Sequence, residues 1–320
     1  MDIFLQILTI IGLCLAGLFC LVLLIGFLQP ERLVNIVMRM VGGMQGLRWR
    51  THDGWPVFEG GTSAEPGDPP LLLIHGFGVD KNTMFDLARV LVRKHQVVAV
   101  DLPGFGDHVM SDPADINMDL FTNKLEQLLD HLGFDQVIPV GSSMGGAISS
   151  MFAARHPERV AGLCLIGPAG LEPPVETEIY AMGKREENPL RINDLEDFEN
   201  LIKLNFTNPP YIPRNLRKAL MRKAVAAADF HEEVMMNMSE YLMDGVRPNL
   251  SRIHCPVTVI WGGDDKIIHP SVAPHWEEGL RDVEMNMIPA VGHSTMMERP
   301  KEVGDIIDRF ITRLRTSVNR

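Results

Sequence analysis

The residue best placed for covalent chemistry is Ser143, the third residue of the run GSSMG at 141–145. An apolar segment at 137–140 precedes this run, and a helical pattern at 144–155 follows it. A G-x-S-x-G run between a strand and a helix places its serine on a sharp, strained turn, where glycines remove side chains that would collide with neighbouring backbone. Ser142 fits this pattern less well, since glycines do not flank it at the required positions. We therefore predict that Ser143 is a nucleophile.

Two later loops supply residues that could activate this serine. The run VGHS at 291–294 contains His293, which would be the general base, and the run WGGDD at 261–265 contains two carboxylates. One carboxylate would hold the imidazole in the productive tautomer and stabilise its cation. The W-G-x-x-D spacing favours Asp265, and Asp264 is then expected to be a solvated turn residue.

The run HGFG at 75–78 predicts a further part of the site. A glycine-rich turn after a strand lets a backbone N–H point into the site, and we assign this donor to Phe77. The second donor is the N–H of Met144, which lies at the positive end of its predicted helix. Together they would form an oxyanion hole, whereas His75 is expected to be structural because His293 already provides the base.

These motifs must be positioned by the elements around them, and after Trp49 short apolar runs alternate with helical patterns. The predicted strands are Trp55–Phe58, Leu71–His75, Val97–Asp101, Val137–Gly141, Leu163–Gly167, Val257–Trp261 and Glu284–Ile288. The predicted helices are Thr83–Arg93, Met118–Leu132, Met144–Arg155, Ser271–Leu280 and Lys301–Arg315. This alternation predicts an α/β fold with a doubly wound, mostly parallel sheet. Each motif lies where a predicted strand ends, which is where open α/β sheets bind their ligands.

The interval 171–251 interrupts the alternation, since it has helical and proline-rich sequence but no strand pattern. About eighty residues are too many for a simple crossover loop in a compact domain. We predict that this interval forms an inserted helical cap or a separate subdomain. The core would then consist of residues 49–170 and 252–320.

The N-terminal segment Ile3–Leu28 is almost entirely apolar, with Gln6 and Thr9 as its polar interruptions. As a helix it would span roughly 39 Å at about 1.5 Å per residue, enough to cross a hydrocarbon core of about 30 Å. We predict a transmembrane anchor over residues 1–30. A cleaved signal peptide is the alternative, but it would need a basic start and a small-residue cleavage site, which fit this segment less well.

Residues 31–48 follow the predicted anchor and have helical apolar spacing. They form either a linker helix packed on the domain or a helix that lies along the bilayer surface. The basic residues near the span, Arg32, Arg39 and Arg48, all lie on its C-terminal side. By the positive-inside rule we therefore expect a membrane protein with a cytoplasmic catalytic domain.

The composition excludes other classes of function. The chain has 320 residues and a formal net charge of −11, from 30 Lys+Arg and 41 Asp+Glu, so it is poorly suited to bind nucleic acid. Its four cysteines suggest no disulfide framework, and its eleven histidines lack the HExxH or CxxC spacing that would hold zinc. We predict no metal, no cofactor and no protein partner.

Six motifs carry a resemblance to a known family: HGFG at 75–78, DLPGFG at 101–106, GSSMGG at 141–146, LCLIGPAG at 163–170, WGGDD at 261–265 and GHSTMMERP at 292–300. With them the chain resembles the α/β-hydrolase superfamily, and more narrowly the membrane-anchored monoacylglycerol lipase branch and related bacterial lipases and esterases. The resemblance implies an α/β-hydrolase fold with an inserted helical cap, preceded by one membrane helix. It also implies a triad of Ser143, Asp265 and His293 in that chain order, with Phe77 and Met144 as oxyanion donors.

The expected activity is hydrolysis of carboxylic esters of lipids, such as monoacylglycerol or a similar acyl ester, through an acyl-enzyme. The substrate would be an amphiphilic small-molecule ester that partitions into a lipid membrane. An aspartate nucleophile would instead indicate a haloalkane dehalogenase or an epoxide hydrolase, but residue 143 is serine. Two alternatives stay open: a carbon–carbon bond hydrolase of ring-cleavage products, and a non-catalytic hydrolase-like membrane sensor.

Overall fold

The computed structural model of this chain describes residues 24–63, 65, 67–185, 188 and 190–318, together with Ile7, Gly17 and Val22. Most of the anchor predicted over residues 1–30 therefore lies outside the described residues, and it stays a prediction. Within the described residues, no helix is both long enough and apolar enough to cross a bilayer. Helix α2 (Pro30–Met44) covers most of the segment that we expected to be a linker or surface helix.

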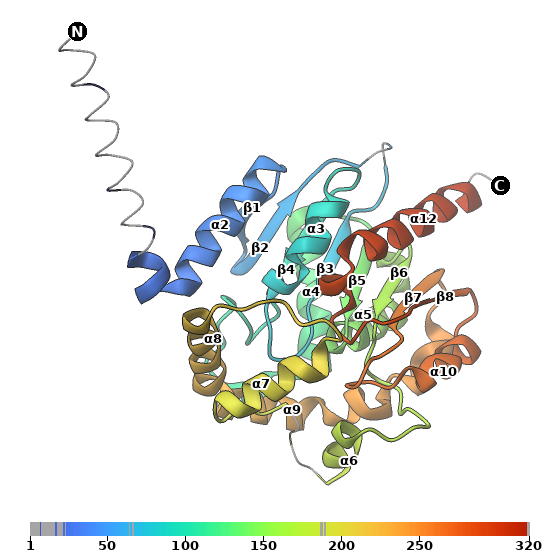
Figure 1. Ribbon diagram of the computed structural model, residues 1–320. Coiled ribbons are helices and arrows are strands. Elements are labelled where there is room, and N and C mark those ends of the chain that lie inside the picture. Colours follow the sequence, from blue (N-terminus) through green and yellow to red (C-terminus); the bar gives the residue numbers. More distant parts are fainter. Residues whose placement is uncertain are drawn as a thin grey trace.

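Eight strands form one sheet in the order β1-β2-β4-β3-β5-β6-β7-β8 (Figure 1). Strands β1 (Arg48–His52) and β2 (Trp55–Gly60) form an antiparallel pair, and β2 pairs antiparallel with β4 (Val97–Val100). All the other neighbours pair in parallel, through β3 (Leu71–Ile74), β5 (Ile138–Ser142), β6 (Leu163–Ile166), β7 (Val257–Gly262) and β8 (Val283–Ile288). The predicted α/β fold with a mostly parallel sheet is confirmed.

The inner strands β3 to β7 are buried along their whole length. Strands covered on both faces need apolar side chains at every position, which explains why their sequences are continuous apolar runs. One face of the sheet packs against α4 (Met118–Leu132) and α5 (Met144–Arg155), and the other against α3 (Phe85–Leu91) and α12 (Pro300–Val318). The sheet is thus the middle layer of three.

Three elements differ from the sequence prediction. Strand β1 was not expected, because its sequence RWRTH is largely polar, and its residues are exposed or half-buried at the sheet edge. The helix predicted at 83–93 is a 3₁₀ turn, Lys81–Met84, followed by α3, since the Asp80 carboxylate accepts a hydrogen bond from the Asn82 N–H and starts the turn early. The helix predicted at 271–280 likewise begins as a 3₁₀ turn, Pro270–Val272, before α10 (Ala273–Gly279).

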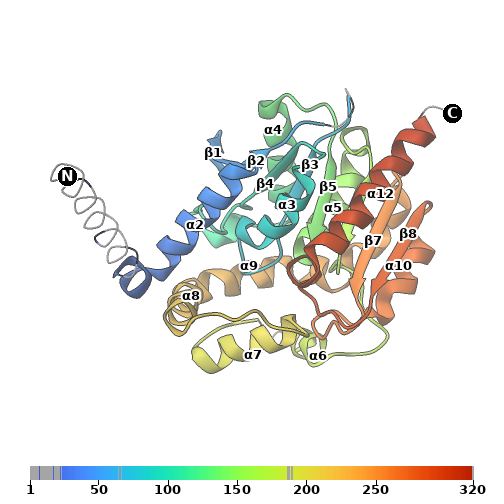
Figure 2. The same cartoon turned by 45° about the horizontal axis from the view of Figure 1, so that its top comes forward.

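The described residues of 171–251, which we call the inserted segment, contain helices and turns but no strand. The elements are α6 (Glu178–Lys184), α7 (Leu195–Asn205), α8 (Arg214–Ala226), α9 (Ala228–Glu240), a π turn at Tyr241–Gly245 and a 3₁₀ turn at Arg247–Arg252. In both views the four helices gather at one end of the sheet (Figures 1 and 2). His231 of α9 contacts Phe77 and Phe105, which follow β3 and β4, so this is the end at which the parallel strands terminate.

Candidate active site

Ser143 lies between β5 and α5 in a backbone conformation that serine rarely adopts, with φ at 54° and ψ at −119°. The turn needs glycine on both sides. A Cβ on Gly141 would lie 2.2 Å from the Gly145 carbonyl oxygen, and a Cβ on Gly145 would lie 2.4 Å from the Ile74 carbonyl oxygen. The G-x-S-x-G run therefore has the sharp strand-to-helix turn that its sequence predicts, with its strain located at the serine.

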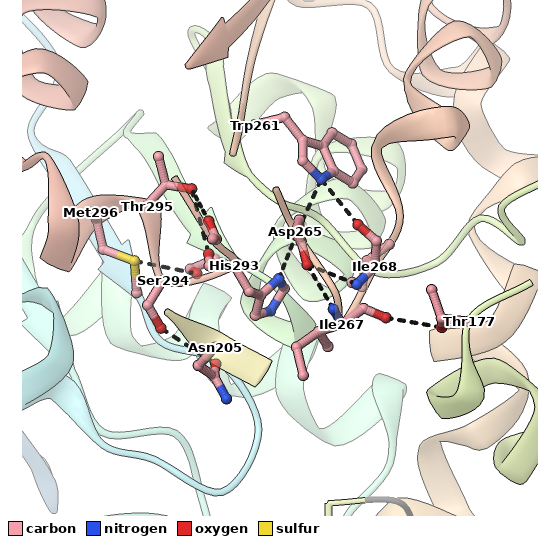
Figure 3. Close-up of polar contacts among 12 residues, drawn as sticks. Thr177, Asn205, Trp261, Asp265, Ile267, Ile268, His293, Ser294, Thr295 and Met296 are labelled. Atoms are coloured by element: carbon pink, nitrogen blue, oxygen red, sulfur yellow. Dashed lines mark hydrogen bonds and ion pairs between the residues drawn. The ribbon is translucent and has the colours of Figure 1, made fainter. Parts of the chain in front are cut away.

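His293 and Asp265 are hydrogen-bonded at the ends of β8 and β7, as Figure 3 shows. His293 Nδ1 lies 2.7 Å from Asp265 Oδ2, and both side chains are buried. The same carboxylate accepts hydrogen bonds from Trp261 Nε1 (3.1 Å) and from the N–H groups of Ile267 and Ile268 (2.9 Å each). These donors hold the carboxylate in place, so it can fix the orientation of the imidazole.

Asp264, the other carboxylate of the run, has a different environment. It is exposed, and among the described residues its side chain accepts a hydrogen bond only from Thr207 Oγ1, at 3.4 Å. The two adjacent aspartates are thus separated by the turn after β7, which directs one side chain toward His293 and the other toward solvent.

The end of β6 brings the serine turn and the histidine together. The Ser143 N–H donates to the Ile166 carbonyl, at 3.0 Å. The next residue is Gly167, with φ at 48°, and a Cβ at that position would lie 3.4 Å from both Asp265 Oδ2 and His293 Nδ1. All three predicted triad residues therefore surround the C-terminal end of one central strand.

The loop after β3 packs directly against the serine. A Cβ on Gly76 would lie 3.3 Å from the Ser143 Cβ. The His75 ring holds this loop, because Nε2 accepts from the Leu102 N–H at 3.0 Å and Nδ1 then donates to the Gly76 carbonyl at 2.7 Å. Burial lowers the pKa of His75, which keeps the ring neutral as this pair of bonds requires. The N–H groups assigned to the oxyanion hole, those of Phe77 and Met144, thus belong to two turns that meet at Ser143.

A buried ion pair that the sequence did not predict lies beneath this loop. The ammonium of Lys81 is almost fully buried and lies 2.5 Å from Asp101 Oδ2 and 2.9 Å from Asp107 Oδ2. Asp101 also accepts from the N–H groups of Lys81 (2.8 Å) and Asp107 (2.9 Å). Burial opposes the charged ammonium, but the attraction of Asp101 outweighs it and raises the pKa of Lys81. The pair ties the loop after β3 to the loop after β4.

Replacing Lys81 by methionine is expected to lower the free energy of unfolding by about 3–5 kcal/mol, because the buried Asp101 would lose its countercharge. Urea unfolding followed by circular dichroism measures the loss. Lys301→Met is the matched control, since Lys301 is 83% exposed in its pair with Asp305 and should change stability by less than about 0.5 kcal/mol. Equal stabilities of the two variants would show that the buried pair does not stabilise the fold.

Glu298 links the histidine loop to the inserted segment, a role that sequence analysis did not assign. Its carboxylate accepts hydrogen bonds from the N–H groups of Gly292 (2.8 Å), Thr207 (3.1 Å) and Asn208 (2.8 Å). A glutamate in the GHSTMMERP motif was visible in the sequence, but its partners in the inserted segment were not. The loop that holds His293 is therefore fastened to the turn after α7.

His231 of α9 is a second residue without a predicted role. Its ring stacks on Phe105 with centroids 4.9 Å apart, and its centroid lies 5.6 Å from that of Phe77. Among the described residues, no side chain or backbone group is hydrogen-bonded to either ring nitrogen. Burial, reinforced by the positive charge of Lys223 and by His75, lowers the pKa of His231 to about 4. A neutral imidazole thus lies against Phe77 at neutral pH.

This lowered pKa predicts a pH dependence of stability. Between about pH 4 and 6.5 the unfolded chain binds a proton at His231 that the folded chain does not, so the free energy of unfolding falls as the pH falls through this window. His231→Phe keeps the ring stacking and removes the titration. We expect it to gain about 1–2 kcal/mol at pH 4 relative to wild type, after allowance for partial exposure. Urea unfolding at pH 4 and pH 7.5 measures this gain in stability. His254→Phe, at an exposed histidine, is the control. Parallel pH profiles of stability for wild type and His231→Phe would contradict the prediction.

One group among the described residues has metal-ligand spacing, formed by Glu126, His156 and Glu158. It lies on α4 and in the turn after α5, and His156 Nδ1 already pairs with Glu126 Oε1 at 3.2 Å. An ordinary ion pair accounts for this group, and no step of the chemistry at Ser143 requires it. The absence of a metal cofactor stays a prediction.

Comparison with known proteins identifies the family of this chain. The alpha/beta hydrolase family matches residues 71–306. The chain is 25% identical to monoacylglycerol lipase ABHD6 of Homo sapiens over 305 residues, which cover 91% of this chain and 90% of that protein. It is 30% identical to Lipase 1 of Psychrobacter immobilis, over 75% of this chain and 76% of that one. The crystal structure of a membrane phospholipase A, a bacterial virulence factor, has a TM-score of 0.81 at 32% identity and covers 98% of this chain and 99% of its own.

Proposed function

Since the chain belongs to the alpha/beta hydrolase family, we propose that Ser143, His293 and Asp265 are the catalytic triad of an enzyme that cleaves carboxylic esters of lipids. That the chain is an ester hydrolase follows from its lipase relatives. The observation that carries the assignment of residues is the 2.7 Å bond between His293 Nδ1 and an Asp265 carboxylate held by three further donors, beside the strained turn of Ser143.

The proposed reaction has two halves. His293 Nε2 takes the proton of the Ser143 hydroxyl as its oxygen attacks the ester carbonyl, and Asp265 stabilises the imidazolium that forms. The oxyanion lies between the N–H groups of Phe77 and Met144. The intermediate collapses, the alkoxide leaves with the proton from His293, and Ser143 holds the acyl group. Water then attacks the acyl-enzyme, and His293 again takes a proton as base. The second tetrahedral intermediate breaks its bond to Ser143, His293 returns the proton to the serine oxygen, and the carboxylic acid leaves.

We propose monoacylglycerol, or a similar ester with one long acyl chain, as the substrate class. Two features support this choice. The curated relatives include monoacylglycerol lipases that match about nine-tenths of the chain, and the apolar segment Ile3–Leu28 would hold the site beside a membrane in which such esters concentrate. Soluble, acidic ring-cleavage products would gain nothing from that location.

The proposed architecture has four parts. Residues 1–30 form a single-pass anchor, 31–48 connect it to the domain, 49–170 and 252–320 form the core, and 171–251 form a cap over the active site. The position of α9 against Phe77 and the bonds of Glu298 to the turn after α7 support the cap. By the positive-inside rule, the basic residues after the anchor support a cytoplasmic location for the catalytic domain.

Labelling with a fluorophosphonate probe tests the nucleophile directly. The full chain in detergent micelles should react stoichiometrically, and peptide mass spectrometry should locate the adduct on Ser143. A folded protein that the probe does not label would end the catalytic proposal and favour a membrane sensor.

Turnover of 1-monoacylglycerol should then be compared with that of a vinylogous diketone acid. Faster cleavage of the diketone acid would assign the triad to carbon–carbon bond hydrolysis instead.

A further inference from the structure

Helix α8 of the inserted segment is basic in a chain that is strongly acidic. Its sequence RNLRKALMRKAVA has five Lys and Arg residues and no Asp or Glu, whereas the whole chain has a net charge of −11. Two of these cations have partners within the fold: Arg217 Nη1 lies 2.7 Å from Glu199 and Lys223 Nζ lies 3.1 Å from Asp80. These two bonds direct Arg217 and Lys223 toward the rest of the molecule.

The other three cations, Arg214, Lys218 and Arg222, form an exposed row. They are spaced by four residues, so they lie on one face of the helix. Within the part of the chain that the structure describes, no carboxylate or other hydrogen-bond partner reaches any of them. Tyr211, just before the helix, is 88% exposed. A row of unpaired cations with an exposed tyrosine beside it is arranged for an anionic surface outside the protein.

Helix α2, which contacts α8, presents an exposed apolar face. Its residues Ile36, Val37, Met40 and Met44 are 45%, 49%, 65% and 79% exposed, and their spacing places them along one side of the helix. Helix α8 contacts α2, and in both views it lies near the N-terminal end of α2 (Figures 1 and 2). Apolar residues of this size are costly to leave in water along a whole helix face.

We propose that the cationic row of α8 and the apolar face of α2 together bind the surface of an anionic lipid bilayer. Anionic headgroups match the charge of the row, and the aliphatic and methionine side chains of α2 can enter the interface between headgroups and acyl chains. An acidic protein would match the charge but would leave the apolar face unexplained. The surface differs from the anchor of the proposed function because it discriminates between lipids by charge.

Helix α8 is connected to the active site, so a bilayer bound to α8 should affect catalysis. Lys223 bonds to Asp80, which begins the 3₁₀ turn directly after the loop of Phe77. The following helix, α9, places His231 against Phe77. A bilayer bound to α8 would therefore lie beside the elements that border the proposed oxyanion hole, and anionic lipid should favour turnover of membrane substrates.

The test uses the full chain in nanodiscs of phosphatidylcholine, alone or with about a third phosphatidylglycerol. Hydrogen–deuterium exchange of residues 211–226 and 30–44 reports the contact without depending on activity. We expect both segments to exchange more slowly in the anionic discs. The variant Arg214→Glu/Lys218→Glu/Arg222→Glu should lose this protection, because three cations shift the contact equilibrium by about a hundredfold.

The matched control is Arg252→Glu/Arg281→Glu/Arg309→Glu, which changes the net charge equally at exposed positions outside α8. It should keep the protection, and both variants should keep normal fluorophosphonate labelling. Equal exchange of α8 in the two kinds of disc, or protection that survives the reversal of the row, would overturn the proposal. Protection of α8 that appears only with an acidic protein would overturn it as well. A protein that binds anionic discs but is not labelled would contradict the proposed function alone.

Discussion

Ser143→Ala is expected to lower kcat for monoacylglycerol hydrolysis by about 10⁶-fold and to abolish labelling by a fluorophosphonate. Without the hydroxyl, no acyl-enzyme can form, and only the oxyanion donors and substrate binding are left to accelerate attack by water. Substrate binding should persist, because the side chain that is removed is small and the turn is held by Gly141 and Gly145. Stopped assays that quantify released fatty acid over hours provide the sensitivity that this measurement needs.

Ser142→Ala is the matched control for the neighbouring hydroxyl. Ser142 is buried at the end of β5, and within the described part of the chain its Oγ donates a hydrogen bond only to the sulfur of Met296, at 3.7 Å. Sulfur is a weak acceptor, so the loss of the Ser142 hydroxyl should change turnover by less than about tenfold. If Ser142→Ala inactivates the enzyme and Ser143→Ala does not, the register of the G-x-S-x-G run has been assigned to the wrong serine.

The core of this fold was predictable because the residues that determine each strand and helix are close together in the sequence. Buried parallel strands require continuous apolar runs, so β3 to β7 appeared in the sequence to within one residue at each end. Helices α4 and α5 were predicted with the observed bounds, since each has a clear helical pattern after a turn. The loops that carry Ser143, Asp265 and His293 converge for the same reason, because parallel strands end at the same edge of a sheet.

The features that escaped prediction depend on partners far away in the chain. Lys81 looks like an ordinary surface lysine until the fold places Asp101 and Asp107 around it. His231 becomes half-buried, with a lowered pKa, only when α9 packs on Phe77. No periodicity or spacing within the inserted segment indicates which of its residues meet the core, so these contacts could not be derived from the sequence.

Asp265→Asn is expected to lower kcat by about 10⁴-fold while leaving the fold and substrate binding nearly intact. The carboxylate accepts from His293 and Trp261 on one oxygen and from the N–H groups of Ile267 and Ile268 on the other. An amide that keeps its oxygen toward the two backbone donors must turn its NH₂ group toward His293. That group donates to Nδ1, so the imidazole proton moves to Nε2. A ring protonated at Nε2 cannot accept the proton of Ser143.

Asp264→Asn provides the control that isolates this effect, since it makes the same chemical change one residue away. Asp264 is exposed, and Thr207 is the one donor to its side chain in the described structure, so turnover should stay within about threefold of wild type. Steady-state kinetics on monoacylglycerol measures the difference in kcat between the two variants. The rate of fluorophosphonate labelling should fall in parallel for Asp265→Asn, because labelling also requires the activated serine. A greater loss in Asp264→Asn would mean that the imidazole is oriented by a different carboxylate, and the bond between His293 and Asp265 would then be structural.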